Sequence, residues 1–486
     1  MILKTTILIL ALVMSVGMDL RPQQSVKTEM GANEIVNLSH LNHLSEHVII
    51  DGQEMLLTRI YAAFPTYEWI EAPGEGIACV DDVTRAVVVY LKHYETFGDR
   101  FSLDMARKGL NFVMYMQQPD GEFYNFITRD HTINRTGITS VRSFDWWAAR
   151  GLWALGYGFR VFSEADQVFA ATLEERILWT LVPIEKALER YGEYFPEIDG
   201  RRAPAWLVAD SAGVTSYVVL GLLEYYSVTQ NPRIAEIINK FCRGLAGSRF
   251  GDFDAFPYGA HLPYARDVRL WHGWGNRQSM ALAKAGRLLE RKEWIESAQK
   301  EADIFFLRLL ATRMLREMRP HPRMFPQIAY GISPIVGGFL ELYNATGNED
   351  YAIAAGLTAS WFMGNNVIKA PMYDPNTGRS FDGIDFAAVN LNSGAESTIE
   401  ALITLIGVTS NEISGRYLHH IALPSRIIRD ELGEIVMQVK IYVSPEGEKL
   451  AVVKCFATRA ISIVDQISEE MLSKYMLGEE VGRGGL

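Results

Sequence analysis

The feature that most constrains the fold of this chain is one type of helix that recurs along it. Six segments begin with polar or acidic residues and continue as runs that are apolar on most faces and rich in Gly and Ala: Asp82–Phe97, Asp145–Phe162, Asp210–Thr229, Gly275–Leu289, Ser333–Thr346 and Ser393–Ile406. Their starts lie 58 to 65 residues apart. A helix that is apolar all round is a buried helix, and a near-constant period indicates a repeat architecture.

Helices of a second kind lie between these segments. They are amphipathic and striped with charge, which predicts one face for packing and one for water: Leu103–Gln117, Leu173–Tyr191, Ile234–Leu245, Glu293–Leu310 and Tyr351–Phe362. A helix at Leu41–Phe64 is expected to supply the sixth outer member. Alternating buried and amphipathic helices predict an all-α fold, an (α/α)6 toroid. An open α-solenoid or an irregular bundle is the alternative.

The C-terminal part of the chain has a different pattern. Ile435–Val443 and Leu450–Phe456 alternate apolar and polar residues around a turn, which predicts a β-hairpin. A final helix is expected near Ser468–Leu477. The chain is therefore divided into a signal peptide (1–20), a toroid domain (21–410) and a C-terminal accessory β-hairpin and helix segment (411–486).

The N-terminus and the composition limit where the protein acts. Lys4, an apolar run from Ile7 to Val16 and small residues at Ser15 and Gly17 have the layout of a secretory signal peptide. We expect a secreted or periplasmic protein; an uncleaved anchor is the alternative. A net charge of −11 argues against nucleic-acid partners. The 3 cysteines are odd in number and widely spaced, so no disulfide framework is implied.

Metal and cofactor signals are weak. His40, His43 and His47 have the spacing of one helical face, but an exposed N-terminal helix is the simpler interpretation. The sequence has no Cys-x-x-Cys pair, Gly-rich phosphate loop or Ser-His-Asp order. No metal and no cofactor are therefore expected.

The connections that lead from each outer helix to the next inner helix are long and lie at one end of such a ring. Three of them, Gln118–Phe144, Arg249–Trp274 and Arg379–Asn392, carry aromatic residues beside carboxylates and amides. Aromatic rings stack on the apolar faces of a sugar, while polar groups bind its hydroxyls. This predicts an oligosaccharide or polysaccharide substrate, bound by residues that include Tyr124, Trp147, Trp271, His272 and Trp274. Simple packing of long loops is the alternative.

Acidic residues gather at the same end. Asp82, Asp145 and Asp210 each begin an inner helix, where an aspartate is also an ordinary N-cap. Asp81 precedes Asp82. Carboxyl groups that share a partly buried cleft raise one another's pKa, and glycoside cleavage uses one carboxyl as a proton donor and a second as base or nucleophile. The three aspartates are the candidate catalytic residues.

One stretch resembles a known family. Asp145-Trp-Trp-Ala-Ala-Arg-Gly-Leu-Trp-Ala154 is similar to the Asp-x-x-Trp-Ala-Arg-Gly-x-x-Trp region of unsaturated glucuronyl and rhamnogalacturonyl hydrolases, which are (α/α)6 toroids. The resemblance implies that Asp145, five residues before Arg150, is catalytic and that Asp82 is its partner. Ala148 replaces a Trp of that motif, and Leu152 stands where a polar residue is usual.

A second resemblance covers most of the toroid. Val80-Asp-Asp-Val-Thr-Arg-Ala86 and Gly394-Ala-Glu-Ser-Thr398 resemble stretches of uncharacterised helical-toroid proteins associated with mannan processing. This likeness implies a role for Glu396 in the site.

The sequence favours an exported glycoside hydrolase, with Asp145 as general acid/base. Arg150 and Arg277 are expected to pair with a uronate carboxylate, since guanidinium groups suit that geometry. The alternatives are a polysaccharide lyase or sugar epimerase, with His272, Tyr124 or His261 moving the proton, and a non-catalytic sugar-binding protein.

Overall fold

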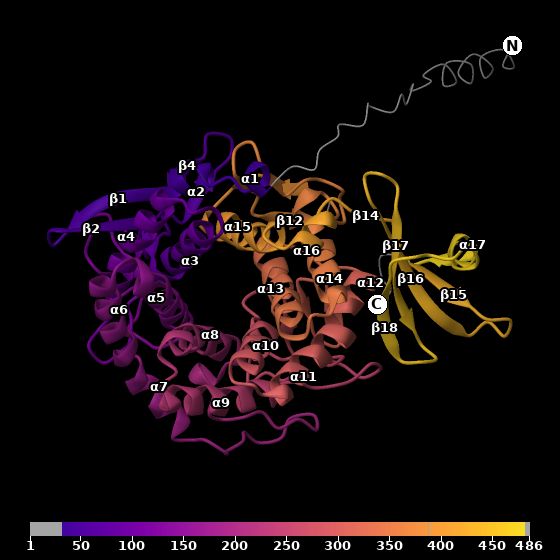
Figure 1. Cartoon of the computed structure of the whole chain (residues 1–486), viewed down its shortest axis with the longest axis horizontal. Coiled ribbons are helices and arrows are strands. Elements are labelled where there is room, and N and C mark those ends of the chain that lie inside the picture. Colours follow the sequence, from indigo (N-terminus) through magenta and orange to yellow (C-terminus); the bar gives the residue numbers. More distant parts are fainter. Residues whose placement is uncertain (1–31, 387, 482–486) are drawn as a thin grey trace, which may run out of the picture.

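The computed structural model describes residues 32–386 and 388–481, so the predicted signal peptide lies outside the described residues. Helices form a ring around a common axis (Figure 1). The inner helices are α3 (Val80–Phe97), α5 (Trp146–Ala165), α8 (Ala212–Thr229), α10 (Gln278–Leu288), α13 (Ala329–Thr346) and α15 (Ala395–Thr409). Each packs against the next, and α15 packs against α3. This contact closes the ring, and the predicted (α/α)6 toroid is confirmed.

An outer layer of helices surrounds this ring. Its members are α4 (Arg100–Met116), α6 (Gln167–Trp179), α7 (Leu181–Leu188), α9 (Pro232–Ala246), α11 (Lys292–Glu301), α12 (Leu307–Ala311), α14 (Glu349–Ala359) and the short α16 (Glu412–Arg416). Asp99, Asp166 and Asn231 cap the N-termini of α4, α6 and α9 through their side chains. These polar caps follow the preceding inner helices within two residues, which keeps these three inner-to-outer turns short.

Helices α5 and α8 pack closely against each other. A Cβ atom added at Gly156 would lie 2.2 Å from the carbonyl oxygen of Gly221 on the facing helix. Glycine at this position therefore lets two backbones approach more closely than any side chain would allow.

Gly156→Ala is expected to destabilise the protein by about 2 kcal/mol, because overpacking against a backbone exceeds the gain of up to about 1 kcal/mol in helix propensity. Gly331 is the matched control: it lies in α13, and an added Cβ would meet no atom within 4 Å. Urea unfolding of both variants measures the difference, and equal stabilities would contradict the close-approach explanation.

The predicted outer helix at Leu41–Phe64 is wrong. Residues Ser45–Ile50 and Gln53–Thr58 form an antiparallel hairpin, β1–β2, after the short helices α1 (Ala32–Ile35) and α2 (Ser39–Leu44). Asp51 and Gly52 both have positive φ, 51° and 77°. An Asp-Gly pair of this kind makes a two-residue hairpin turn, and this signal outweighs the helical spacing of the apolar residues.

The three histidines therefore do not share a helical face. His40 and His43 lie on α2, whereas His47 lies on β1. His40 is buried and its ring contacts the carbonyl oxygen of Ser393, and burial lowers its pKa to about 4.

The toroid also contains more strands than an all-α fold would have. Short strands pair within its connections: β3 (Tyr61–Ala63), β4 (Glu68–Ile70), β5 (Ala78–Cys79), β6 (Phe126–Ile127), β7 (Trp271–His272), β8 (Glu317–Met318), β9 (Pro322–Arg323), β10 (Tyr373–Asp374), β11 (Arg379–Ser380), β12 (Gly383–Asp385) and β13 (Ala388–Asn390). Most have two or three residues, too few for sequence alternation to reveal them.

A mixed segment follows the ring. The predicted hairpin is present as β16 (Ile435–Val443) and β17 (Lys449–Cys455), within a sheet completed by β14 (Ile421–Ala422), β15 (Arg426–Arg429), β18 (Ala460–Val464) and β19 (Glu479–Glu480). One face buries Val439 and Ile441 with Tyr475 of α17 (Glu469–Leu477). On the other, Tyr442 joins the core of the toroid, beside α12 (Figure 1). The domain division at residue 410 stays a prediction.

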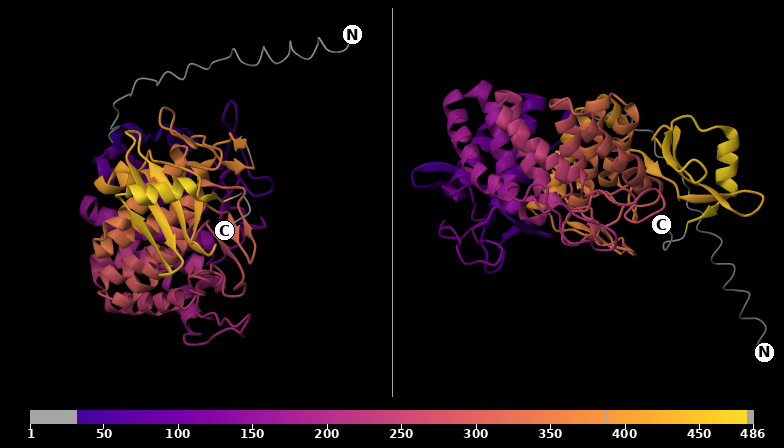
Figure 2. Two further views of the ribbon diagram at one scale, coloured as in Figure 1. Left: turned by 90° about the vertical axis from the view of Figure 1, so that its right-hand side faces the viewer. Right: turned by 90° about the horizontal axis from the view of Figure 1, so that it is seen from below.

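The long connections that precede the inner helices gather on one side of the ring (Figure 2, right). They span 117–145, 189–211, 247–277, 312–328 and 364–394. The opposite turns contain only a few residues. Among the described helices, none combines the length and apolar character needed to cross a membrane.

Candidate functional site

A pocket of about 600 Å³ opens at the end of the ring where the long connections gather. The first turns of four inner helices form its floor, and the connections form its walls. Its polar and aromatic lining consists of Tyr61, Asp81, Asp82, Arg85, Asn125, Phe126, Thr139, Trp146, Trp147, Arg150, Trp274, Arg316, Tyr330, Asp382, Glu396 and Ser397.

Arg85 is the centre of the charge network on this floor. Its guanidinium is 1% exposed and lies within 3.6 Å of four carboxylates, those of Asp81, Asp82, Glu396 and Glu400. Nη2 donates to Asp82 Oδ1 at 2.9 Å, and Nη1 lies 3.1 Å from Glu400 Oε1 and 3.5 Å from Glu396 Oε2. Asp82 and Arg85 lie one helical turn apart on α3, while both glutamates come from α15. The contact that closes the ring therefore also assembles the network.

A second buried arginine, Arg277, extends this network behind Glu400. Arg277 and Glu400 are both fully buried and joined at 2.8 Å. Arg277 also donates to Tyr217 and Ser333. Glu400 thus forms ion pairs with two arginines, whereas Asp82 and Glu396 both form their ion pair with Arg85.

Arg150 holds the neighbouring acid. Its guanidinium donates to Asp81 and to the hydroxyl of Tyr330, and it lies over the ring of Trp146, 5.1 Å from the centroid. Asp81 keeps 27% of its side chain exposed to the pocket. The ion pair fixes one edge of the floor.

Tryptophans lie beside this ion pair. Trp146 and Trp274 lie with ring centroids 6.3 Å apart, and Trp274 stacks on His272 at 3.5 Å. Gly275 adopts a positive φ of 74°, and a Cβ there would lie 2.9 Å from the Trp146 ring. Glycine thus allows the connection to pass close to the ring. Flat apolar surfaces beside carboxylates suit a sugar.

Three carboxyl groups of the pocket have raised pKa values. Burial is the main cause for Asp82, Glu396 and Asp382, and Arg85 opposes it at the first two. Glu396 is still 46% exposed, because it lies within a concave surface that opens to solvent. Asp82 is 7% exposed, and its second oxygen accepts from the Cys79 thiol at 3.3 Å. Elevated pKa values in a cleft are typical of acid–base sites.

The structure brings together six of the residues that the sequence predicts for the site: Asp81, Asp82, Trp147, Arg150, Trp274 and Glu396. The other six do not line the pocket. Three of these are buried behind it, namely Trp271, His272 and Arg277. Trp271 packs on Phe305, and burial lowers the pKa of His272 to about 3.

The remaining three lie beside the pocket or outside it. Asp145 caps α5 by accepting from the Trp146 amide, and burial raises its pKa. Asp210 pairs with Arg266 at 2.6 Å. Tyr124 packs under the guanidinium of Arg135.

Several lining residues were missed from the sequence. Arg85 follows Asp82 by three positions and Asp81 by four, so helical spacing could have placed it with both acids. Tyr330, Arg316 and Asp382 come from other repeats and carried no local signal. Among residues 32–386 and 388–481, no group of three His, Cys, Asp or Glu side chains has the arrangement of a metal site.

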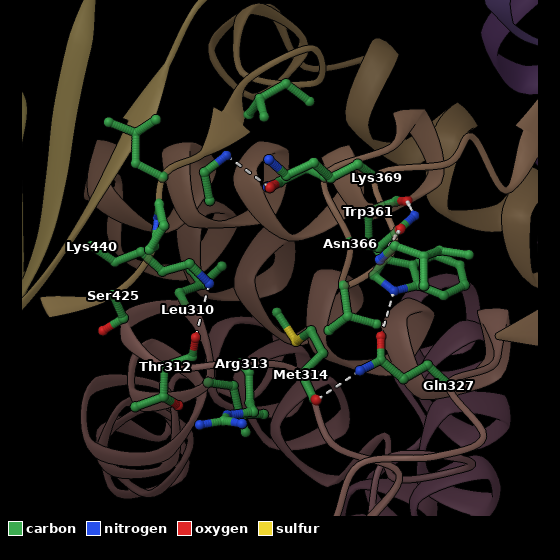
Figure 3. Close-up of a pocket in the computed structure, with 18 of the residues that line it drawn as sticks. Leu310, Thr312, Arg313, Met314, Gln327, Trp361, Asn366, Lys369, Ser425 and Lys440 are labelled. Atoms are coloured by element: carbon green, nitrogen blue, oxygen red, sulfur yellow. Dashed lines mark hydrogen bonds between the residues drawn. The ribbon is translucent and has the colours of Figure 1, made fainter. Parts of the chain in front are cut away.

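A second cavity, of about 530 Å³, separates the toroid from the C-terminal sheet (Figure 3). Its polar groups largely satisfy one another: Lys440 donates to the Thr312 carbonyl, Trp361 to Gln327, and Gln327 to the Met314 carbonyl. Of the described residues that line it, Glu480 alone is acidic. The cavity therefore lacks the paired carboxyls of the toroid pocket, which we take as the candidate active site.

No protein-family model matches this sequence, and no curated protein matches it. Solved structures do match the fold. A D-mannose isomerase is 12% identical over 80% of this chain and 99% of its own, with a TM-score of 0.56. The cellobiose 2-epimerase from Spirochaeta thermophila is 13% identical over 78% and 96%, with a TM-score of 0.54. A sugar epimerase from a ruminal bacterium is 13% identical over 77% and 97%, with a TM-score of 0.52.

These likenesses show the architecture. The protein has the same fold as these structures, a toroid of helical hairpins, and the matches cover 77% to 80% of this chain.

Proposed function

We propose that the protein is a carbohydrate-active enzyme that hydrolyses glycosidic bonds in oligosaccharides. The observation that carries this proposal is the position of Asp82 and Glu396, which compete for one guanidinium beneath a wall of tryptophans. The sugar-processing names of the neighbours with the same fold agree with a sugar ligand.

The two carboxyls have different roles in this proposal. Asp82 has the shorter contact with Arg85, 2.9 Å against 3.5 Å for Glu396. Asp82 is therefore the ionised member, and Glu396, which is more exposed to the pocket, holds the proton. Glu396 protonates the glycosidic oxygen, while Asp82 acts at the anomeric carbon as nucleophile or as the base of a water.

In this proposal Glu396, and not Asp145, is the general acid, because the Asp145 carboxylate caps α5. Arg150 keeps Asp81 in place at the edge of the site. Trp146, Trp147 and Trp274 provide surfaces on which pyranose rings stack.

Epimerisation is the second candidate, since two neighbours with the same fold are epimerases. It requires a base that removes a proton beside a carbonyl. The described lining of the pocket contains no histidine. His261 is buried and held by Glu301 at 2.8 Å, and His272 is covered by Trp274. The side chains that line the pocket therefore favour hydrolysis.

Incubation of the protein with mannans, pectins and lyase-treated uronides tests the proposal. Hydrolysis releases new reducing ends, which chromatography detects. Inversion at C2 of mannose or cellobiose without bond cleavage, detected by NMR, would instead identify an epimerase. Release of no sugar from any glycan would reject the hydrolase.

The pH profile of kcat/KM is expected to be bell-shaped. Glu396 must be protonated, so activity falls as the pH rises through its raised pKa, while Asp82 must be ionised, so activity falls as the pH drops through its own. Because burial raises both pKa values, the midpoint of the acidic limb is expected at a higher pH than the pKa of an ordinary aspartate. Profiles from about pH 3 to about pH 9 measure both limbs. A rate that stays flat across this range would contradict the assignment.

A further inference from the structure

Of the three arginines that line the pocket, two form ion pairs with carboxylates in the described part of the chain and the third does not. Arg85 is joined to Asp82, and Arg150 is joined to Asp81. Arg316 is partly buried, yet among the described residues its side chain takes part in no hydrogen bond or ion pair. A partly desolvated cation without a counter-ion is unfavourable. Its position is best explained by a charge that arrives with the ligand.

The backbone of Arg316 is held firmly. Its N–H donates to the carbonyl oxygen of Arg323 at 3.0 Å, and its own carbonyl accepts from Gly273 at 3.1 Å. Both bonds flank the small sheet formed by β7, β8 and β9, and Trp274 follows the end of β7 by two residues. The guanidinium and a stacking ring are therefore presented by one rigid element.

This element faces the acids across the pocket. The order of the inner ring places α10 opposite α3 and α13 opposite α5 (Figure 1). Arg316 lies next to β8 on the connection before α13, and β8 pairs with β7 on the connection before α10. Asp81 and Asp82 begin α3. A ligand that spans the pocket therefore has carboxylates at one end and a free guanidinium at the other.

The expected partners of a substrate carboxylate, Arg150 and Arg277, are both occupied. Arg277 is fully buried with Glu400, and Arg150 holds Asp81 and Tyr330. Arg316 alone of the lining arginines can present two N–H groups to an incoming anion in the planar fork that suits a carboxylate.

We propose that Arg316 binds the carboxylate of an acidic sugar, so that the pocket selects uronic-acid-containing oligosaccharides. The inference rests on the proposed function for its catalytic setting, but it concerns binding. A neutral sugar would leave Arg316 unpaired, whereas a uronate compensates it.

Binding of free monosaccharides tests the inference without turnover. Glucuronate and galacturonate are compared with glucose and galactose by tryptophan fluorescence, since Trp146 and Trp274 line the pocket. We expect the acids to bind about tenfold more tightly, as for one charge-assisted contact. Arg316→Gln should abolish this preference and Arg316→Lys should keep part of it. Arg319→Gln, which breaks an ion pair with Asp267 on the same connection, is the matched control and should keep it.

The same variants are then assayed on oligogalacturonides and on those oligosaccharides after reduction of their carboxyl groups to alcohols. Equal affinity of the wild type for acidic and neutral sugars, binding of neither, or a preference that persists in Arg316→Gln would overturn the inference. Cleavage of neutral glycans without acid preference would leave the hydrolase intact and reject Arg316 as the selector. Acid preference without cleavage of any glycan would reject the hydrolase alone.

Discussion

Glu396→Gln is expected to lower kcat by about 100-fold or more, because removal of a positioned proton donor costs 10²–10⁴ in rate. The amide keeps the size of the side chain and can still contact Arg85, so the pocket retains its shape. Asp82→Asn should cause a loss of similar size by removing the ionised partner. Steady-state kinetics on the substrate found in the glycan panel measure both effects.

Two further variants separate catalysis from folding. Glu412→Gln alters a surface glutamate paired with Arg416 and should leave kcat unchanged. Asp145→Asn keeps an N-cap on α5, since asparagine caps as well as aspartate, and should retain most of the activity. If Asp145→Asn were inactive and Glu396→Gln active, the roles derived from the pocket would be reversed, and the assignment suggested by the motif would stand. Thermal unfolding confirms that each variant is folded.

Arg277→Met is expected to destabilise the protein by about 3–5 kcal/mol, the usual result of breaking a buried ion pair by removing one partner. Arg277 and Glu400 are both 0% exposed, and the loss of Arg277 leaves Glu400 with Arg85 alone. Tyr217 and Ser333 lose a donor as well.

Urea unfolding of Arg277→Met against Arg416→Gln measures the difference. Arg416 forms an exposed pair with Glu412, and such pairs contribute about 0–1 kcal/mol. Equal effects of the two substitutions would show that the buried pair contributes no more than a surface one.

The repeat of buried helices was predictable because burial leaves a strong signature: each inner helix is apolar on nearly every face. The end of the ring that holds the site was predictable for a related reason, since the long aromatic connections all precede inner helices. The hairpin at Ser45–Thr58 was missed because its apolar residues also fit a helical period, and the Asp51-Gly52 turn decided the outcome.

The site itself was only half predictable. Asp82, Arg150 and Glu396 lie within the stretches that resemble other toroid proteins, and all three line the pocket. Asp145 fits its motif equally well, yet its carboxylate turns to the backbone of its own helix. Spacing along a chain cannot separate a cap from a proton donor, because both require an acid at a helix start. Arg316 and Tyr330 carry no sequence signal, because only the closed ring brings them to Asp81 and Asp82.

Arg85 and Glu396 are 311 residues apart in the sequence, and they meet only where the last inner helix docks on the first. During synthesis, the floor of the pocket cannot exist until α15 has left the ribosome and joined α3. Five repeats without the sixth would expose Arg85 and Asp82 at an open edge and would lack Glu396, the proposed proton donor. Under the proposed roles, activity requires complete ring closure, and a chain cut before residue 395 is expected to be inactive.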